Sequence, residues 1–378
     1  MEYKALKDIA KITMGQSPDS ASYNEVGDGL PFYQGNADFG EKYPNERIWC
    51  NEPKKTAEPG DILISVRAPI GALNYAKDIC CIGRGLAAIT IEDEAERNYV
   101  FHLLKAKKND LNNQGTGSTF KAIGKVVLEE LKVPQISKEG QQKCMDMMDL
   151  LESIIRERKR QMVEFDHLIK ARFVEMFGNP EINSKKWAMR LLSQHLDVIG
   201  GYAFKSSDFS EDRGIPVLRI GNINGGIFKP INMVYWPEEE KLARYLMYPG
   251  DLVMSLTGTV GKDDYGNVCI LGNDYDKYYL NQRNAKIEIR DGLDKLYLAE
   301  LLKFEQIKKR LTGISRGVRQ ANISNKDILN LVVPIPPIVL QSQFAAFVAQ
   351  VNKIKATVQK SLDETQILFD SLMQQYFG

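Results

Sequence analysis

The sequence lacks the features of a membrane-bound, secreted or disulfide-bonded protein. No apolar run approaches the roughly 20 residues that a membrane-spanning helix needs, and the first residues, Met1 to Asp8, contain no signal-peptide core. The cysteines are odd in number and form no C-x-x-C pair. We therefore expect a cytoplasmic protein in which five cysteines are small buried hydrophobes, namely Cys50, Cys80, Cys81, Cys144 and Cys269.

Motifs for cofactor or metal chemistry are also missing. The glycine-rich stretch from Gly117 to Val126 has neither P-loop spacing nor a Ser or Thr after its Lys, and no G-x-G-x-x-G follows a predicted strand. The histidines are scattered and have no H-x-x-x-H or Cys partner, which favours structural or surface roles for His102, His167 and His195. The sequence therefore predicts no catalytic residue, no metal site and no bound cofactor.

One acidic pair needs a separate interpretation. Asp263 and Asp264 resemble a paired-carboxylate site, but they fall beside Lys262 and Gly266 in a predicted hairpin turn. A solvated turn explains them better. The net charge of the chain is only +1, so any polyanion must be bound by local clusters of Lys and Arg.

Two long helices are the main organising feature that the sequence does contain. A mixed polar and apolar run follows Pro134 and ends at Gly178, and a second run follows Pro334 and ends at Gly378, 200 residues later at both ends. A continuous helix requires this constancy, since one extra residue would rotate everything beyond it by about 100°. Each run has about 40 residues, which as a helix would be roughly 60 Å long.

Apolar residues in both runs recur at alternating three- and four-residue steps, which predicts that each helix pairs with another helix. Arg158 and Gln161 interrupt the first stripe. The predicted partner of each run is its own copy, and antiparallel pairing would give a pseudo-two-fold axis. The predicted pairing residues are Leu151, Ile154, Phe165, Leu168, Phe344, Val351, Ile354, Val358, Leu368 and Leu372.

The segments before the two helices also repeat. The turn and strand that begin at Pro59-Gly60-Asp61 recur at Pro249-Gly250-Asp251, and the strand from Leu30 to Asn36 recurs from Ile215 to Asn222. We therefore predict an α+β fold with two similar domains and two long antiparallel coiled-coil helices. The predicted segments are a first domain at 1–136, a central helix at 137–178, a second domain at 179–336 and a C-terminal helix at 337–378.

Polar and basic residues gather on loops near predicted strand ends, at equivalent places in both domains. Arg pairs with guanine, Gln and Asn pair with adenine, and Lys, Ser and Thr hold backbone phosphates. Loops tolerate insertion and carry function, so the two loop sets are expected to contact different ligand surfaces. The DNA-binding candidates are Gln34, Asn36, Lys42, Arg67, Arg84, Ser118, Thr119 and Lys121 in the first domain, and Lys205, Arg219, Asn222, Thr257, Lys262, Gln282, Arg283, Arg316, Arg319 and Gln320 in the second.

This arrangement resembles the specificity subunits of type I restriction-modification systems over essentially the whole chain. The resemblance rests on the paired Pro-Gly-Asp strands, on Arg84-Gly85-Leu86-Ala87-Ala88-Ile89 with its looser copy at Gln282, and on Val333-Pro334-Ile335-Pro336-Pro337 before the last helix. Residues Ile136 to Gln141 lack the paired prolines of the second copy, Pro336 and Pro337. Docking of partner subunits at the first helix is therefore expected to differ in detail from docking at the second.

The resemblance implies a non-catalytic subunit of a larger complex. Each domain would be a target recognition domain that reads one half of a split sequence in double-stranded DNA. The helices would set the spacing of the halves and dock two methyltransferase subunits, and restriction subunits would complete the complex. S-adenosylmethionine and ATP with Mg²⁺ would bind those partners and not this chain. The alternatives are a stand-alone methyltransferase or nuclease with an unrecognised site, and a coiled-coil adaptor that does not bind DNA.

Overall fold

A computed structural model describes residues 2–117, 121–223, 225–259, 262, 264–313 and 320–378. Contacts divide the chain into two compact units. Unit 1 comprises Met1–Arg160 and Gln359–Gly378, and unit 2 comprises Gln161–Val358. Each unit therefore includes part of both long helices. This division differs from the four predicted segments, in which each helix was a segment of its own.

Unit 1 is built on a sheet with the strand order β2-β10-β7-β8. Successive side chains of a strand point to opposite faces. Ile62 and Ile64 of β7 accordingly pack into the core beside the helices, while Leu63 packs into a second core. Burial on both faces explains the continuous apolar run in this strand. The strands are β2 (Lys11–Met14), β7 (Ile62–Ser65), β8 (Leu73–Tyr75) and β10 (Leu86–Thr90).

A second sheet in unit 1 covers the other face of the first, with the order β3-β5-β4-β9-β6. Its strands are β3 (Tyr23–Asn24), β4 (Leu30–Tyr33), β5 (Trp49–Cys50), β6 (Thr56–Ala57) and β9 (Cys80–Ile82). β4 and β9 run parallel, with Tyr33 opposite Ile82. The loops that follow these two strands therefore start side by side. Unit 1 also contains the strand pair β1 (Glu2–Ala5) and β11 (Lys132–Gln135), with helices α1 (Glu94–Ala106), α2 (Lys108–Asn113) and α3 (Lys125–Glu129).

Unit 2 repeats this plan. Its first sheet has the order β13-β21-β17-β19, with strands Leu196–Gly200, Asn284–Ile289, Leu252–Ser255 and Val268–Ile270. Its second has the order β15-β14-β20-β16, with strands Val234–Trp236, Ile215–Leu218, Tyr278–Leu280 and Leu246–Met247, and β14 and β20 are again parallel. Further pairs are β12 (Ala188–Leu191) with β23 (Val332–Ile335) and β18 (Thr257–Thr259) with β22 (Gln320–Asn322). The helices are α5 (Lys295–Leu302), α6 (Glu305–Thr312) and α7 (Asn325–Leu329).

The repeated Pro-Gly-Asp motif is a turn that starts the central strand of each unit. In unit 1 the Asp61 amide donates to the Glu58 carbonyl at 3.0 Å, and Gly60 has a φ of +89°. A proline followed by a glycine with positive φ is the composition of a type II turn. The Asp61 carboxylate also accepts the Glu58 amide at 2.9 Å. The same two bonds occur at Asp251, so the repeat in the sequence is a repeat in structure.

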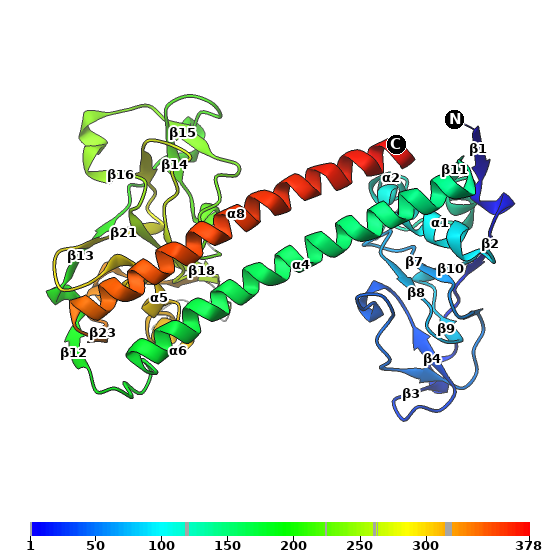
Figure 1. Cartoon of the computed structure of the whole chain (residues 1–378), viewed down its shortest axis with the longest axis horizontal. Coiled ribbons are helices and arrows are strands. Elements are labelled where there is room, and N and C mark those ends of the chain that lie inside the picture. The colour runs from blue at the N-terminus through cyan, green and yellow to red at the C-terminus, as the bar shows by residue number, and fades with distance from the viewer. Residues whose placement is uncertain (1, 118–120, 224, 260–261, 263, 314–319) are drawn as a thin grey trace. The chain divides into compact units, whose positions relative to one another are not determined.

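The predicted α+β class with an internal repeat is thus confirmed. The long helices are α4 (Lys138–Phe177) and α8 (Ile338–Phe377), each of 40 residues and 200 residues apart at both ends. They run antiparallel within each unit (Figure 1). In unit 1, Met148 of α4 shares a core with Met373 of α8. In unit 2, the rings of Phe173 and Phe344 lie 5.4 Å apart.

The buried stripe of the helices departs from the predicted one. Leu151, Phe344, Val351 and Val358 are buried as predicted, and Ile154, Phe165 and Leu372 are half-buried. Leu168, Ile354 and Leu368 are instead 47%, 51% and 49% exposed. Near two of these positions the next residue, Ile169 or Phe369, is buried. A strict heptad drifts against the 3.6-residue turn, and the helix ends also pack on the core of their unit, so the buried stripe there advances by fours.

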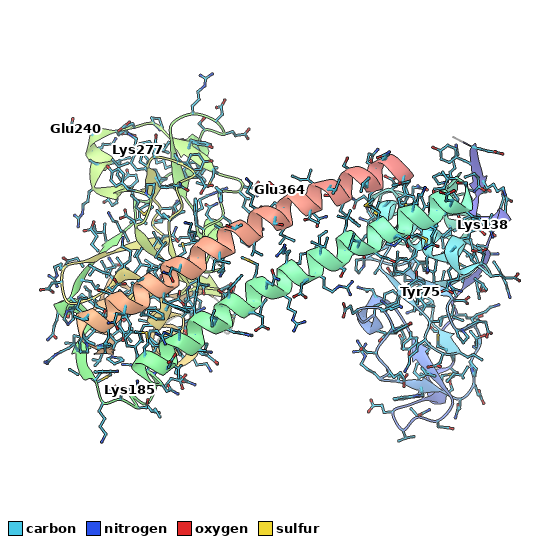
Figure 2. The ribbon with its side chains drawn as sticks, viewed as in Figure 1. Tyr75, Lys138, Lys185, Glu240, Lys277 and Glu364 are labelled. Atoms are coloured by element: carbon cyan, nitrogen blue, oxygen red, sulfur yellow. The ribbon has the colours of Figure 1, made fainter. Side chains whose placement is uncertain are left out.

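Helix α4 ends through local capping. Gly178 has a φ of +77°, which suits the left-handed position after a helix. Lys185, labelled in Figure 2, donates from Nζ to the carbonyls of Glu175 and Met176 at 2.7 and 3.0 Å. Trp187 Nε1 donates to the Phe177 carbonyl at 2.9 Å. These side chains satisfy carbonyls that have no partner inside the helix.

Candidate nucleic-acid interface

Four candidates of unit 1 line one hollow of about 220 Å³. They are Gln34, Asn36, Arg67 and Arg84, and Gly35, Ala68 and Gly85 complete the lining. The candidates come from three separate stretches of sequence, each just after a strand. The prediction that they lie near strand ends therefore gains a specific geometry, because the fold brings all four together.

Strand pairing explains why these stretches meet. The parallel strands β4 and β9 end together, and the Gly83 amide donates to the Tyr33 carbonyl at 2.8 Å. Strand β7 of the first sheet ends beside them, where the Val66 amide donates to the Gly85 carbonyl at 2.9 Å. Residues after each strand thus emerge at one edge where the two sheets meet.

Two features shape the hollow. Asp38 Oδ2 accepts the Gln34 and Gly35 amides at 2.7 and 3.3 Å, which fixes the turn after β4. A Cβ on Gly85 would lie 2.2 Å from the Gln34 carbonyl oxygen, so this close approach needs glycine. Sequence reasoning missed Gly85 and Asp38, although the glycine after Arg84 and the acidic residue four positions after Gln34 were visible signals.

The hollow is electropositive. Arg67 and Arg84 are exposed, and within the described residues neither has a carboxylate closer than 4 Å, whereas Asp38 is paired with Arg47. None of the described residues that line the hollow is acidic. The site therefore presents two guanidinium groups and two side-chain amides, which suit phosphates and base edges.

The other unit 1 candidates are divided between two places. The Lys121 carbonyl accepts the Ala68 amide at 3.0 Å, so Lys121 borders the hollow and its side chain is exposed. Lys42 lies elsewhere, on a separate cavity of about 660 Å³ that Tyr75 and His102 also line. Ser118 and Thr119 lie outside the described residues.

Unit 2 has different side chains at the corresponding positions. The Leu256 amide donates to the Arg283 carbonyl at 2.8 Å, which matches the Val66 bond to Gly85. Arg283 therefore occupies the place of Gly85, Gln282 that of Arg84 and Thr257 that of Arg67. Gln282 and Arg283 are exposed, and Arg283 has no ion-pair partner in the part of unit 2 that the structure describes.

Two unit 2 candidates have structural partners instead. Arg219, at the place of Gln34, donates from Nη2 to the Asn232 carbonyl of its own loop. Asn222 corrects the prediction, because its side chain is buried and fully used. It accepts the Arg219 amide at 2.9 Å and donates to the Lys229 and Ile231 carbonyls at 3.1 and 2.9 Å. An amide in a turn was mistaken for a free base-reading group.

The remaining unit 2 candidates stay predictions. Lys205 and Lys262 are exposed. Gln320 lies in β22 opposite Thr259, but its side chain is not described. Arg316 and Arg319 fall outside the described residues. Asp264 accepts the Thr259 amide at 2.8 Å, and this bond lowers the pKa of its carboxyl, in agreement with the turn interpretation.

The cysteines have structural environments. All five cysteines are free and buried, as predicted, and burial raises the pKa of the Cys81 and Cys144 thiols to about 11, which keeps them protonated. Among the described residues no group of His, Cys, Asp or Glu could hold a metal ion. Nor is any described helix long and apolar enough to cross a membrane.

Comparisons with known proteins agree on one family. A specificity subunit of Methanocaldococcus jannaschii, provisionally assigned to the MjaX type I restriction enzyme, is 42% identical over 157 residues, which are 41% of this chain and 37% of that protein. The MjaVIII specificity subunit of the same organism is 24% identical over 285 residues, 71% of this chain and 66% of that protein. The chain thus matches less than two thirds of the length of these relatives.

A solved structure shares the fold. The type I restriction-modification S subunit from M. genitalium aligns over 100% of this chain and 96% of its own, with a TM-score of 0.58 at 15% identity. The family model for the type I restriction modification DNA specificity domain matches residues 1–164 and 184–364. The two matched ranges together take up most of the chain and coincide with its internal repeat. The chain therefore belongs to the family of type I restriction-modification DNA specificity domains.

Proposed function

We propose that this chain is the DNA-recognition subunit of a type I restriction-modification complex, in which unit 1 and unit 2 each read one half of a bipartite site. The observation that carries the proposal is the hollow of unit 1, lined by two side-chain amides and by two guanidinium groups that have no ion-pair partner among the described residues. The unit 2 equivalent presents Gln282 and Arg283 at the same strand ends. Two similar frames with different readers fit two different half-sites.

Electrostatics supports DNA as the ligand despite the net charge of +1. A duplex attracts local cationic clusters, and its affinity follows the number of phosphates contacted rather than the total charge of the protein. Sequence is read by side chains that reach base edges. Arg, Gln and Asn, the residue types of the hollow, make those contacts.

The long helices would dock the methyltransferase subunits. Besides its buried stripe, α4 exposes Met147, Leu150 and Leu168, and α8 exposes Ile354 and Ile367, each at 44% or more. Figure 2 shows side chains projecting from both helices. Leu150 and Leu168 lie about five helical turns apart and so share one face of α4, and an exposed apolar face is suited to further helices. In this proposal the chain catalyses nothing and acts in the cytoplasm. S-adenosylmethionine and ATP with Mg²⁺ would bind the methyltransferase and restriction subunits.

The direct test uses the chain assembled with its methyltransferase subunits on random duplexes. We expect selection of a bipartite sequence with an unread spacer. Replacing residues 1–136 by the domain of another family member should change one half only. A change in both halves, or the absence of any selected sequence in an assembled complex, would overturn the proposal. Methylation or cleavage by the isolated chain would instead support the stand-alone enzyme.

Docking of the methyltransferase can be tested by substituting one exposed apolar residue on α4 and, as a control, one exposed apolar residue outside the helix. Leu150→Asp should weaken assembly with the methyltransferase, because Leu150 is 57% exposed on α4. Ile182→Asp is the matched control, since Ile182 is 75% exposed but follows the helix. If both variants assembled like the parent chain, or both failed, this helix face would not be the docking surface.

The helices would also set the spacer. Seven residues inserted after Arg160 in α4 and after Val358 in α8 keep the facing stripes in phase, since seven residues make about two turns. The insertion lengthens each helix by about 10 Å, which at about 3.4 Å per base pair should add roughly three base pairs to the spacer. If the complex still selects both half-sites and the spacer length is unchanged, the helices do not set the spacer length.

A further inference from the structure

We propose that the hollow of unit 1 reads a guanine base in the major groove through Arg67 and Arg84. This inference rests on the proposed function and assigns one base class to one site. Guanine is the base that presents two acceptors, N7 and O6, on its major-groove edge. A guanidinium donates to both at once, and this bidentate pair is the commonest specific contact with DNA.

The lining of the hollow selects against the other bases. Cytosine presents an amino donor in the major groove and is read by a carboxylate, but the lining residues that the structure describes include no acidic one. The nearest acidic side chain in the turn, Asp38, accepts two backbone amides and is paired with Arg47. Gln34 and Asn36 are suited to an adenine beside the guanine, at a neighbouring base step.

The two arginines are held on fixed backbone. Arg67 lies between two hydrogen bonds, from the Val66 amide to the Gly85 carbonyl at 2.9 Å and from the Ala68 amide to the Lys121 carbonyl at 3.0 Å. The Arg84 amide donates to Ser17 Oγ at 3.4 Å, and the neighbouring Gly83 amide donates to Tyr33. A fixed backbone lowers the entropy cost of placing each guanidinium and suits a base reader more than a loose phosphate contact.

Gly85 lets the backbones at the rim of the hollow approach each other. A Cβ at this position would lie 2.2 Å from the Gln34 carbonyl oxygen, so the approach needs glycine. Unit 2 has Arg283 at this place, and it has Thr257 and Gln282 where unit 1 has its two arginines. Unit 2 thus lacks the pair of arginines found in unit 1. The guanine read by Arg67 and Arg84 is therefore expected in the half-site of unit 1.

Arginine-to-lysine exchange separates base reading from phosphate binding. Lysine keeps the charge but loses the planar fork that makes bidentate contacts. Sites are selected from random duplexes by the assembled complex with the parent chain, Arg67→Lys or Arg84→Lys. We expect one or both variants to lose a roughly 5- to 140-fold preference for guanine at one position of one half-site, which corresponds to about 1 to 3 kcal/mol. The salt dependence of binding should stay the same.

Arg47→Lys is the matched control, because Arg47 lies in the same unit but is paired with Asp38. It should leave the selected sequence unchanged. If both Arg67→Lys and Arg84→Lys select the parent sequence, the arginines bind phosphate and the inference is overturned. The bipartite proposal would then still stand, because the parent complex selects its site in the same experiment. The inference would also be overturned if the variants lost a preference for adenine and that half-site contained no guanine. The base in the hollow would then be read by the amides of Gln34 and Asn36.

Discussion

Unit 1 and unit 2 share the strand order of their first sheet but contact the long helices through different interactions. In unit 2 five aromatic rings meet at the helices, namely Phe173, Phe177, Tyr297, Phe304 and Phe344. Corresponding positions of unit 1 keep two rings, Tyr99 and Phe377, and have Ala106, Cys144 and Met373 at the others. Tyr99 and Tyr297 donate to equivalent carbonyls, those of Pro134 and Pro334, which confirms the correspondence.

Charged contacts accompany the smaller apolar core of unit 1. His102 of α1 lies 3.2 Å from Asp149 of α4, and Lys105 pairs with Glu152. At the start of α4, Lys138 Nζ lies 2.7 Å from Asp93 (Figure 2 labels Lys138). Unit 2 uses a buried amide at the start of α8, where Gln341 Nε2 donates to the Pro336 carbonyl at 2.8 Å.

The difference shows that similar sheets can be held against the long helices by different kinds of interaction. Aromatic packing depends little on pH or salt, because it buries apolar area and gains ring contacts. Ion pairs and a buried imidazole respond to both. Unit 1 should therefore be the unit whose contacts with the helices respond to solution conditions, and the following experiments test that difference.

The largest effect should come from Phe173→Ala. Phe173 is fully buried and contacts four other rings at centroid distances of 4.9 to 5.4 Å. Its removal should cost about 3 to 5 kcal/mol of unfolding free energy. Met373→Ala, at the corresponding place in unit 1, should cost less, about 2 kcal/mol, since Met373 is at the edge of its core. Native-state hydrogen exchange resolves the two units. Each variant should lower protection in its own unit, and equal loss in both would show that the units are not energetically separate.

DNA binding gives the next largest effect. Arg283→Ala in unit 2 should cost roughly 1 to 3 kcal/mol at one base position if Arg283 reads a base. If it holds a phosphate, the variant should instead bind all sequences more weakly and lose about one counterion from the salt dependence. The measurement is duplex binding by the assembled complex at several salt concentrations. If the affinity for the duplex and its salt dependence are both unchanged, Arg283 is a solvated surface residue that does not contact DNA.

A fall in pH should lower the stability of unit 1 by an intermediate amount. Burial lowers the pKa of His102, an effect that Lys105 reinforces and that Glu152 and Asp149 oppose. The unfolded chain then binds the proton more readily, so stability is full above the ordinary imidazole pKa of about 6.5 and is lost as pH falls through it. Each unit of pKa difference is worth about 1.4 kcal/mol.

Hydrogen exchange of unit 1 between pH 7.5 and 5.5 measures this loss, and His102→Gln is its control. Glutamine can still donate to Asp149 but does not titrate in this range. The parent chain should lose more protection on acidification than the variant. If the two chains lose protection equally, other groups cause the pH dependence of unit 1.

The sequence predicted the fold well where a pattern was repeated, and less well where side-chain partners decided the outcome. The helix bounds followed from a constant 200-residue spacing, and the Pro-Gly-Asp turns followed from backbone requirements that only a few residue types meet. The buried stripe was misplaced at Leu168 because periodicity does not show which face meets the core of the unit. Asn222 was misassigned because its three partners lie in a loop whose path the sequence does not disclose.

At the candidate site, too, the sequence predicted the residues but not which of them meet. Residue types and strand ends predicted Gln34, Arg67 and Arg84 as ligand contacts, but their meeting in one hollow depends on the parallel pairing of β4 with β9. Paired residues that are 49 positions apart in the chain, such as Tyr33 and Ile82, give no local signal of such pairing. Arg219 matched its unit 1 counterpart in position, yet its own loop engages it.

The smallest effect should come from Arg156→Ala. Arg156 of α4 pairs with Glu41 at 2.6 Å, but the two side chains are 63% and 74% exposed. An exposed pair gains little Coulomb energy, and it loses side-chain entropy. We expect a loss below about 0.5 kcal/mol of unfolding free energy at low salt and none at high salt, where ions screen the pair. Urea denaturation at two salt concentrations measures it, with Arg160→Ala as the control, because the ion-pair partner of Arg160 among the described residues is Glu157 of its own helix at 4.0 Å. A larger loss that persists in high salt would mean that the stem of Arg156, which lines the cavity beside Tyr75, packs against unit 1 and stabilises it by contact rather than by charge.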